Sequence, residues 1–168
     1  MYEHRMVRLH YTTYDVQRDT DILHPHIGEL RHGNNIMVLA RDEPVGDKPA
    51  ARRLRFWYAK VLGAFHVDVT YEGPGLRDWN PRRLDFLWVR WYETTNPDTY
   101  GWKSSTLQSL SFPSLEGVHS LGFVDPADVI RACHIIPAFS SGKRFADGIG
   151  SSALAVNKDE WNKYYVGR

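Results

Sequence analysis

The chain contains a single cysteine, Cys133, among its 168 residues. One cysteine excludes a disulfide within the chain and any zinc site built from several cysteines. No apolar run approaches the ~20 residues that a membrane-spanning helix needs, and no apolar segment typical of a secretory signal follows the first methionine. We therefore expect an intracellular protein, nuclear or cytoplasmic, with no membrane partner.

The chain also has almost no net charge, since the formal value at pH 7 is only +1. The strongly basic balance that often marks nucleic-acid-binding proteins is therefore missing from the chain as a whole. Aromatic residues are instead abundant, with six Trp and nine Tyr. Each joins a large apolar body to a polar handle and favours strands and interfaces. This composition indicates a β-rich binding protein more than an enzyme.

Runs rich in β-forming residues predict most of the secondary structure. The predicted strands cover 5–17, 36–40, 55–71, 84–93 and 134–137. Gly63 predicts a bulge or a sharp bend inside the longest of them. Asp125 and Pro126 predict the start of a short helix over 125–133, and Asn157 is the expected cap of a second over 158–165. The predicted fold is mainly β with short helices, as one small, partly open barrel of the SH3-like or bromo-adjacent type.

The length suits one domain over residues 1–168. The expected parts are N-terminal strands over 5–40, a polar loop over 41–54, a barrel core over 55–139, and a Ser/Gly-rich segment with the C-terminal helix over 140–168.

Alternation along the two longest strands divides their side chains between two faces. Trp57, Ala59 and Val61 share one apolar face, which we expect to meet the core. The opposite faces combine aromatic and basic residues, namely Phe56, Tyr58, Lys60, Trp88, Arg90 and Tyr92. This aromatic-basic face can stack nucleobases or hold a methylated lysine by cation–π attraction. The alternative is that its aromatic rings pack beneath loops.

One enzyme hypothesis also follows from the sequence. His66 and Asp68 lie two apart on a predicted strand, so both point to one face, and His134 can complete the facial triad of a non-haem iron site. Arg144, ten residues beyond, resembles the arginine that holds the cosubstrate carboxylate in Fe(II)- and 2-oxoglutarate-dependent oxygenases. A third alternative is a structural, homodimerising domain that uses the aromatic-basic face as its subunit interface.

Four runs carry a family resemblance, and they cover 11–19, 56–66, 85–92 and 122–139. Together they resemble uncharacterised proteins of mushroom-forming fungi that are associated with KDZ-type transposable elements. The resemblance implies a fungal source and a mobile-element link. It implies no activity, so no functional residue is carried over.

A weaker resemblance concerns architecture and rests on 57–61, 89–92 and 129–136. These segments look like the bromo-adjacent homology domain, which binds histone tails or partner proteins on an SH3-like barrel. Glu93 and Thr94 depart from that pattern. The leading expectation is thus a mobile-element-derived interaction module that binds a protein tail or nucleic acid through the aromatic-basic face.

Overall fold

The computed structural model describes residues 1–25, 33–40, 56–95, 107–117, 119–152 and 157–167. Strands dominate these residues, and the expected mainly-β class is confirmed. The strands are β1 (Tyr2–His4), β2 (Val7–Thr12), β3 (Arg18–Leu23), β4 (Asn35–Leu39), β5 (Phe56–Gly73), β6 (Leu76–Trp91), β7 (Glu93–Thr94), β8 (Ser109–Ser111), β9 (Leu121–Val124), β10 (Val129–Ala132), β11 (His134–Pro137) and β12 (Tyr164–Gly167). Within the same described ranges lie the short 3-10 helices η3 (Pro126–Asp128) and η4 (Phe139–Ser141). No helix within the described part of the chain is long and apolar enough to cross a membrane.

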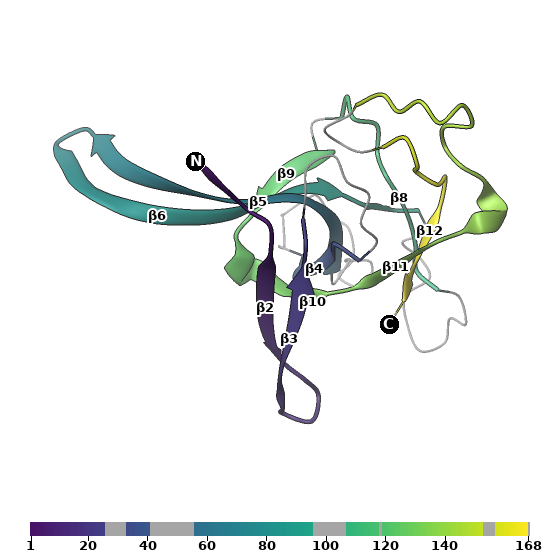
Figure 1. Cartoon of the computed structure of the whole chain (residues 1–168), viewed down its shortest axis with the longest axis horizontal. Helices are drawn as coiled ribbons and strands as arrows, with labels where there is room; N and C mark the ends of the chain where they lie inside the picture. Colours follow the sequence, from purple (N-terminus) through teal and green to yellow (C-terminus); the bar gives the residue numbers. More distant parts are fainter. Residues whose placement is uncertain (26–32, 41–55, 96–106, 118, 153–156, 168) are drawn as a thin grey trace, which may run out of the picture.

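The strands form three antiparallel sheets (Figure 1). A six-stranded sheet has the order β10-β4-β5-β6-β9, with β1 also paired to β5. A four-stranded sheet has the order β11-β12-β8-β7, and β2 with β3 makes a separate hairpin. The sheets are not closed into a barrel.

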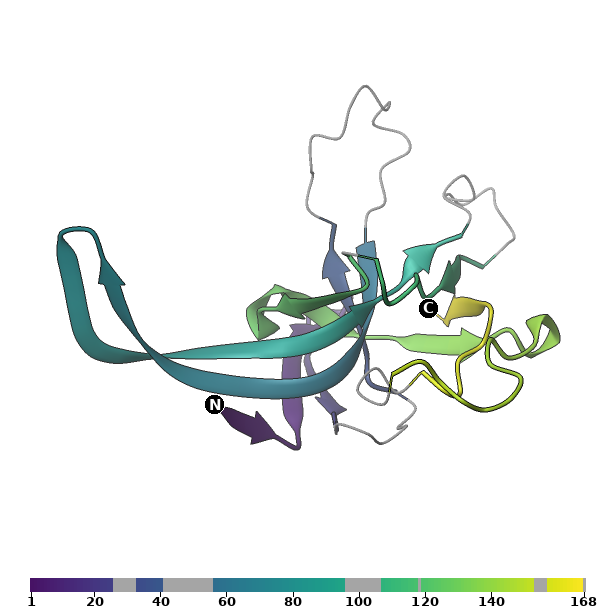
Figure 2. The same cartoon turned by 90° about the horizontal axis from the view of Figure 1, so that it is seen from above.

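The hairpin of β5 and β6 is the longest feature of the fold. Its turn lies at Gly73-Pro-Gly75, where Gly75 takes a φ of 80° that suits glycine. The pairing shifts register between Val61 and Gly63, which confirms the predicted bulge. β6 begins at Leu76, before the predicted strand at 84, so the outer part of the hairpin extends as an arm away from the other elements (Figures 1 and 2).

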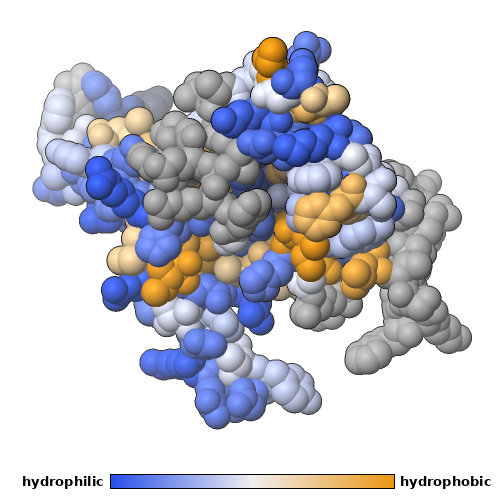
Figure 3. All heavy atoms as spheres, turned by 45° about the vertical axis from the view of Figure 1, so that its right-hand side comes forward, coloured by the Kyte–Doolittle hydropathy of each residue, from blue (hydrophilic) through white to orange (hydrophobic). Residues whose placement is uncertain are grey.

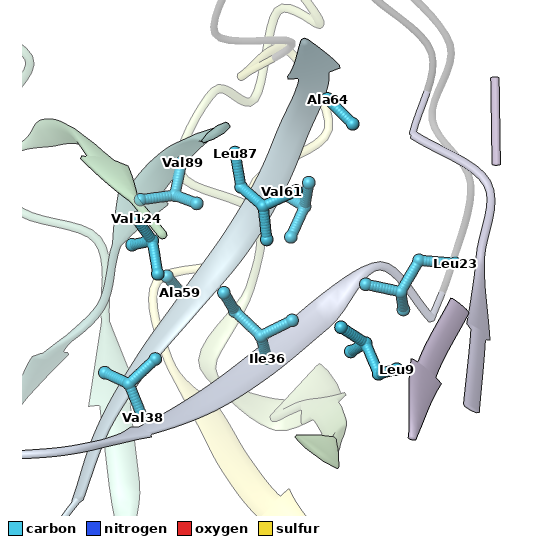
Figure 4. Close-up of a cluster of buried hydrophobic side chains, with 10 residues drawn as sticks. All are labelled: Leu9, Leu23, Ile36, Val38, Ala59, Val61, Ala64, Leu87, Val89 and Val124. Carbon is cyan, nitrogen blue, oxygen red and sulfur yellow. The ribbon is translucent and has the colours of Figure 1, made fainter. Parts of the chain in front are cut away.

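β5 is buried on both faces at its inner end, because two apolar clusters flank it. The first cluster lies between the six-stranded sheet and the β2–β3 hairpin and contains Leu9, Leu23, Ile36, Val38, Ala59, Val61, Ala64, Leu87, Val89 and Val124 (Figure 4). The second cluster joins the six-stranded and four-stranded sheets and contains Tyr58, Leu110, Phe112, Tyr164 and Val166. This two-sided burial explains why the start of β5 reads as a nearly continuous apolar run.

The predicted strand over 5–17 is wrong in its second half, because the chain turns after Thr12. Thr13 and Gln17 close the turn, with the Thr13 N–H donating to the Gln17 carbonyl at 2.8 Å. Val16 has a φ of 64°, the left-handed region that reverses the strand direction. The result is the β2–β3 hairpin, which Figure 3 shows projecting as a hydrophilic extension.

Both predicted helices are also wrong. Asp125 does cap a helical turn, since its carboxylate accepts a 2.8 Å hydrogen bond from the Ala127 N–H. The turn ends after Asp128, and the β-branched pair Val129-Ile130 continues as β10 against β4, which favours such residues. At 158–165 no helix forms, and Tyr164 starts β12 between β11 and β8.

Candidate functional site

The aromatic-basic face is not an open surface. Tyr58 is only 3% exposed and Arg90 only 1% exposed. Phe56, Lys60, Trp88 and Tyr92 are half-buried. The four-stranded sheet covers much of this face, since Tyr58 belongs to the second cluster, and Phe56 and Tyr92 pack against it. Of the two alternatives left open by the sequence, the burial favours packed aromatic rings over an open strand face, because β5 is a central strand with structure on both sides.

Lys60 and Tyr92 nevertheless reach a pocket of about 480 Å³ between the six-stranded and four-stranded sheets. The aromatic residues that line it are Tyr92, Phe112, Phe139, Trp161 and Tyr164. The polar residues that line it are Asn35, Lys60, Lys143, Asp159 and Glu160. The pocket thus combines ring surfaces with charges of both signs.

The aromatic residues form two groups. Tyr92 stacks on Phe112 with ring centroids 4.1 Å apart, and Tyr164 meets both rings edge-on. Phe139 and Trp161 form an edge-to-face pair at 4.9 Å. Phe139 is 67% exposed, so this second pair offers ring surface to solvent at the pocket.

Of the two lysines among the described residues that line the pocket, Lys60 lacks a carboxylate partner, whereas Lys143 has one. Within the described ranges the Lys60 ammonium makes no hydrogen bond and no ion pair. Burial, and next the positive charge of Arg90, lower the pKa of Lys60 to about 8, against a smaller opposing effect of Asp159. Near pH 7 the amine is therefore still charged and poorly compensated.

The other charges beside the pocket are paired. Arg90 and Glu160, both buried, form an ion pair in which Arg90 also donates to the second carboxylate oxygen at 3.2 Å. Arg144 lies 3.6 Å from the same carboxylate, and Lys143 is 3.2 Å from Asp159.

Burial lowers the pKa of the Arg90 guanidinium to about 10, which leaves it charged near neutral pH. Four cationic side chains then meet two carboxylates, and the excess of two positive charges makes this region attractive to anions. The four cations are Lys60, Arg90, Lys143 and Arg144, and the carboxylates are those of Asp159 and Glu160.

The proposed iron ligands are not brought together. His66 and Asp68 both lie on β5, where Asp68 pairs opposite Arg83, whereas His134 lies on β11 in the other sheet. The Arg144 guanidinium donates to the Phe112 carbonyl at 2.8 Å and faces Glu160. Among the described residues, the His66 group of potential metal ligands contains His4 and Asp85, and not Asp68 or His134.

Sequence reasoning missed the contribution of the C-terminal segment to the pocket. Lys143, Asp159, Trp161 and Tyr164 all come from residues 140–168, which were expected to be a Ser/Gly-rich segment and a helix. The available signal was the presence of Trp161 and Tyr164 in an otherwise polar stretch. Aromatic residues in such a stretch indicate a buried or binding surface.

Comparison of the chain with protein-family models, with curated proteins and with solved structures gave no match. These comparisons therefore supply no activity or ligand that could be transferred to the chain. The mobile-element origin and the bromo-adjacent resemblance stay predictions. Function has to be inferred from the chemistry of the pocket.

Proposed function

We propose that the protein is a binding module whose pocket receives a nucleotide unit of single-stranded nucleic acid. The observation that carries the proposal is the half-buried ammonium of Lys60, which lines the pocket together with aromatic residues and has no hydrogen-bond or ion-pair partner in the described part of the chain. The proposal keeps the nucleic-acid alternative of the sequence reading and two residues of its aromatic-basic face, Lys60 and Tyr92.

The charge of the pocket favours an anionic ligand. Even a half-buried ammonium is costly without a partner, and an incoming phosphate would satisfy it by a charge-assisted hydrogen bond. The nearby carboxylates of Asp159 and Glu160 are already engaged by Lys143, Arg90 and Arg144. A basic tail of the histone type would instead bring like charge towards Lys60, which argues against that alternative.

The ring surfaces favour a flat ligand group next to the anion. Base stacking on an aromatic side chain contributes ~1–3 kcal/mol per base, largely regardless of sequence. Phe139 and Trp161 provide such surfaces beside Lys143, whose ammonium lies 6.0 Å from the Trp161 ring centroid. The pocket volume of about 480 Å³ falls within the ~300–1,000 Å³ typical of ligand pockets.

The test is fluorescence anisotropy of a labelled 15-nucleotide oligothymidine with the full chain and two pocket variants. Lys60→Gln removes the charge and Phe139→Ala removes an exposed ring, so neither is expected to unfold the protein. Lys158→Gln is the matched control, because Lys158 is exposed and does not line the pocket. We expect at least tenfold weaker binding for both pocket variants and a change below twofold for the control.

Two further probes identify the ligand class. Thymidine monophosphate is expected to displace the labelled oligonucleotide. It should need a higher concentration than unlabelled oligothymidine does, because a single nucleotide makes fewer contacts. An oligoglutamate peptide supplies negative charge without rings and is expected to compete poorly. The proposal is overturned if the oligonucleotide does not bind, if Lys60→Gln and Lys158→Gln weaken binding equally, or if oligoglutamate binds more tightly than the oligonucleotide.

A further inference from the structure

A second group of polar side chains lies on the six-stranded sheet, near the base of the arm. It contains His4 of β1, His66 of β5 and Asp85 of β6. His66 and Asp85 are direct cross-strand partners, and His4 pairs opposite Ala64, two residues from His66 on the same face. Three adjacent strands therefore bring these side chains together, although they are far apart in sequence.

The geometry of this group is tight. His4 Nε2 and His66 Nδ1 are 2.7 Å apart, and the potential ligand atoms of all three residues lie within 4.8 Å of one another. The Tyr2 ring stacks on His66 with centroids 4.8 Å apart, which restricts the orientation of the imidazole. Both histidines are half-buried, whereas Asp85 is exposed.

We propose that His4, His66 and Asp85 bind one divalent transition-metal ion of the zinc type. The bonds would be made by His4 Nε2, His66 Nδ1 and a carboxylate oxygen of Asp85. Two imidazoles and one carboxylate are a donor set that Zn²⁺ accepts in sites with an open fourth position. This site is separate from the nucleotide pocket and does not depend on it.

Small side-chain movements would adapt the group to an ion. Zinc–ligand bonds of about 2.0–2.1 Å in a tetrahedron place ligand atoms about 3.3 Å apart. The two nitrogens, now 2.7 Å apart, would separate slightly, and the carboxylate would move inwards from at most 4.8 Å. Metal binding requires each imidazole to carry its proton on the other ring nitrogen, so the histidine that donates the present His4–His66 hydrogen bond would change tautomer.

The surroundings also fit a metal site. Arg83 donates to Asp85 Oδ1 from Nη2 at 2.7 Å and from Nε at 3.0 Å, and so holds the carboxylate in place as an outer partner. His4 and Asp85 also line a hollow of about 400 Å³. This hollow leaves space for water or a small ligand at the fourth position.

A bound ion would have a structural consequence for the N-terminal strand. β1 is joined to β5 by three paired residues, Tyr2, Glu3 and His4. A metal bond through His4 adds a link from β1 to both β5 and β6. Protection of the amides of β1 is therefore a local readout of binding.

The test is calorimetric titration of Zn²⁺ into the full chain, prepared without a histidine tag. We expect one equivalent to bind the wild type. His4→Ala, His66→Ala and Asp85→Asn are each expected to weaken binding at least tenfold. Asp85→Asn is the most informative variant, since it conserves shape at an exposed position and leaves the fold intact. His10→Ala is the matched control, because His10 is exposed on the β2–β3 hairpin, where its imidazole bonds the Thr20 hydroxyl.

Hydrogen exchange supplies an independent measurement. Zn²⁺ is expected to slow exchange at residues 2–4 in the wild type and in His10→Ala, but not in Asp85→Asn. The proposal is overturned if the wild type binds no stoichiometric Zn²⁺, if Asp85→Asn and His66→Ala bind it as tightly as the wild type, or if exchange slows elsewhere and not in β1.

Discussion

Arg90 and Glu160 lie seventy residues apart in sequence and form a buried ion pair. Arg90 lies on β6, a strand of the six-stranded sheet. Glu160 lies just before β12, which is a strand of the four-stranded sheet. The Arg90 guanidinium also lies 4.3 Å from the centroid of the Phe112 ring. This pair therefore links the two sheets at the pocket, which Glu160 itself lines.

Replacing Glu160 by Gln is expected to destabilise the fold strongly. It leaves the Arg90 charge buried without its counter-ion, and the loss of one partner of such a pair typically costs ~3–5 kcal/mol. The measurement is urea unfolding at neutral pH. Arg82→Met breaks a surface pair with Asp78 and is the control, with an expected change below ~1 kcal/mol. Equal effects of the two variants would contradict the structural role of the buried pair.

Lys60 is expected to reduce stability at neutral pH. Its pKa in the folded protein is lowered to about 8, so the unfolded chain binds the extra proton between pH 8 and 10.5. Stability from this group therefore rises with pH across that window, and the burial penalty is complete below pH 8. Lys60→Met is expected to be more stable than the wild type at pH 7, by on the order of 1–3 kcal/mol.

The difference between wild type and Lys60→Met should shrink at pH 10, which urea unfolding at the two pH values measures. Lys158→Met, at an exposed position, is the control. A difference that is the same at pH 7 and pH 10 would show that the lysine charge is not the cause.

The affinity of the pocket for oligothymidine should also depend on pH. The Lys60 amine loses its proton as the pH rises through about 8, and its attraction for phosphate is lost with it. Bound phosphate favours the charged amine, so the midpoint in the complex lies above that of the free protein. Anisotropy titrations from pH 6.5 to 9.5 at constant salt measure this, and Lys60→Gln is expected to remove the step. A wild-type profile that is flat over this range would exclude Lys60 as the anion contact.

Val16→Gly is expected to stabilise the protein by about 0.5–1 kcal/mol. Val16 is exposed and has a φ of 64°, a conformation that a β-branched residue adopts only at a cost. Glycine removes that cost but gains freedom in the unfolded chain, so the net gain is modest. Thermal unfolding measures it. Val16→Ala retains a Cβ and is expected to change stability less, and a larger gain for Ala than for Gly would contradict the backbone explanation.

The long strands were predictable because their residues satisfy local and tertiary preferences together. Residues 55–71 are rich in β-formers, and Gly63 marks the bulge that β5 contains. The prediction of a helix after Asp125 was wrong beyond its first turn. Asp125 does cap that turn, but a cap determines only the residues next to it. Pairing with β4 then determines the conformation of Val129–Ala132.

The pocket was only half predictable. Lys60 and Tyr92 were found from strand alternation, which places them on the correct face. The opposing wall was not found, because Trp161 and Tyr164 approach only after β12 pairs with β11 and β8. Such non-local pairing leaves no periodic pattern in the segment itself. His66 was likewise recognised as a potential metal ligand, but its neighbours His4 and Asp85 come from other strands.

The outer arm of β5 and β6 gives the molecule a part whose length can vary independently. The arm runs from the Asp68–Arg83 pair to the turn. Among the described residues, its strands β5 and β6 pair only with each other there. Six residues of strand, Asp68 to Gly73, correspond to a reach of about 20 Å. Insertions or deletions of matched residue pairs there would lengthen or shorten this reach while leaving both apolar clusters intact. Among homologous sequences, the arm is where differences in length would accumulate first.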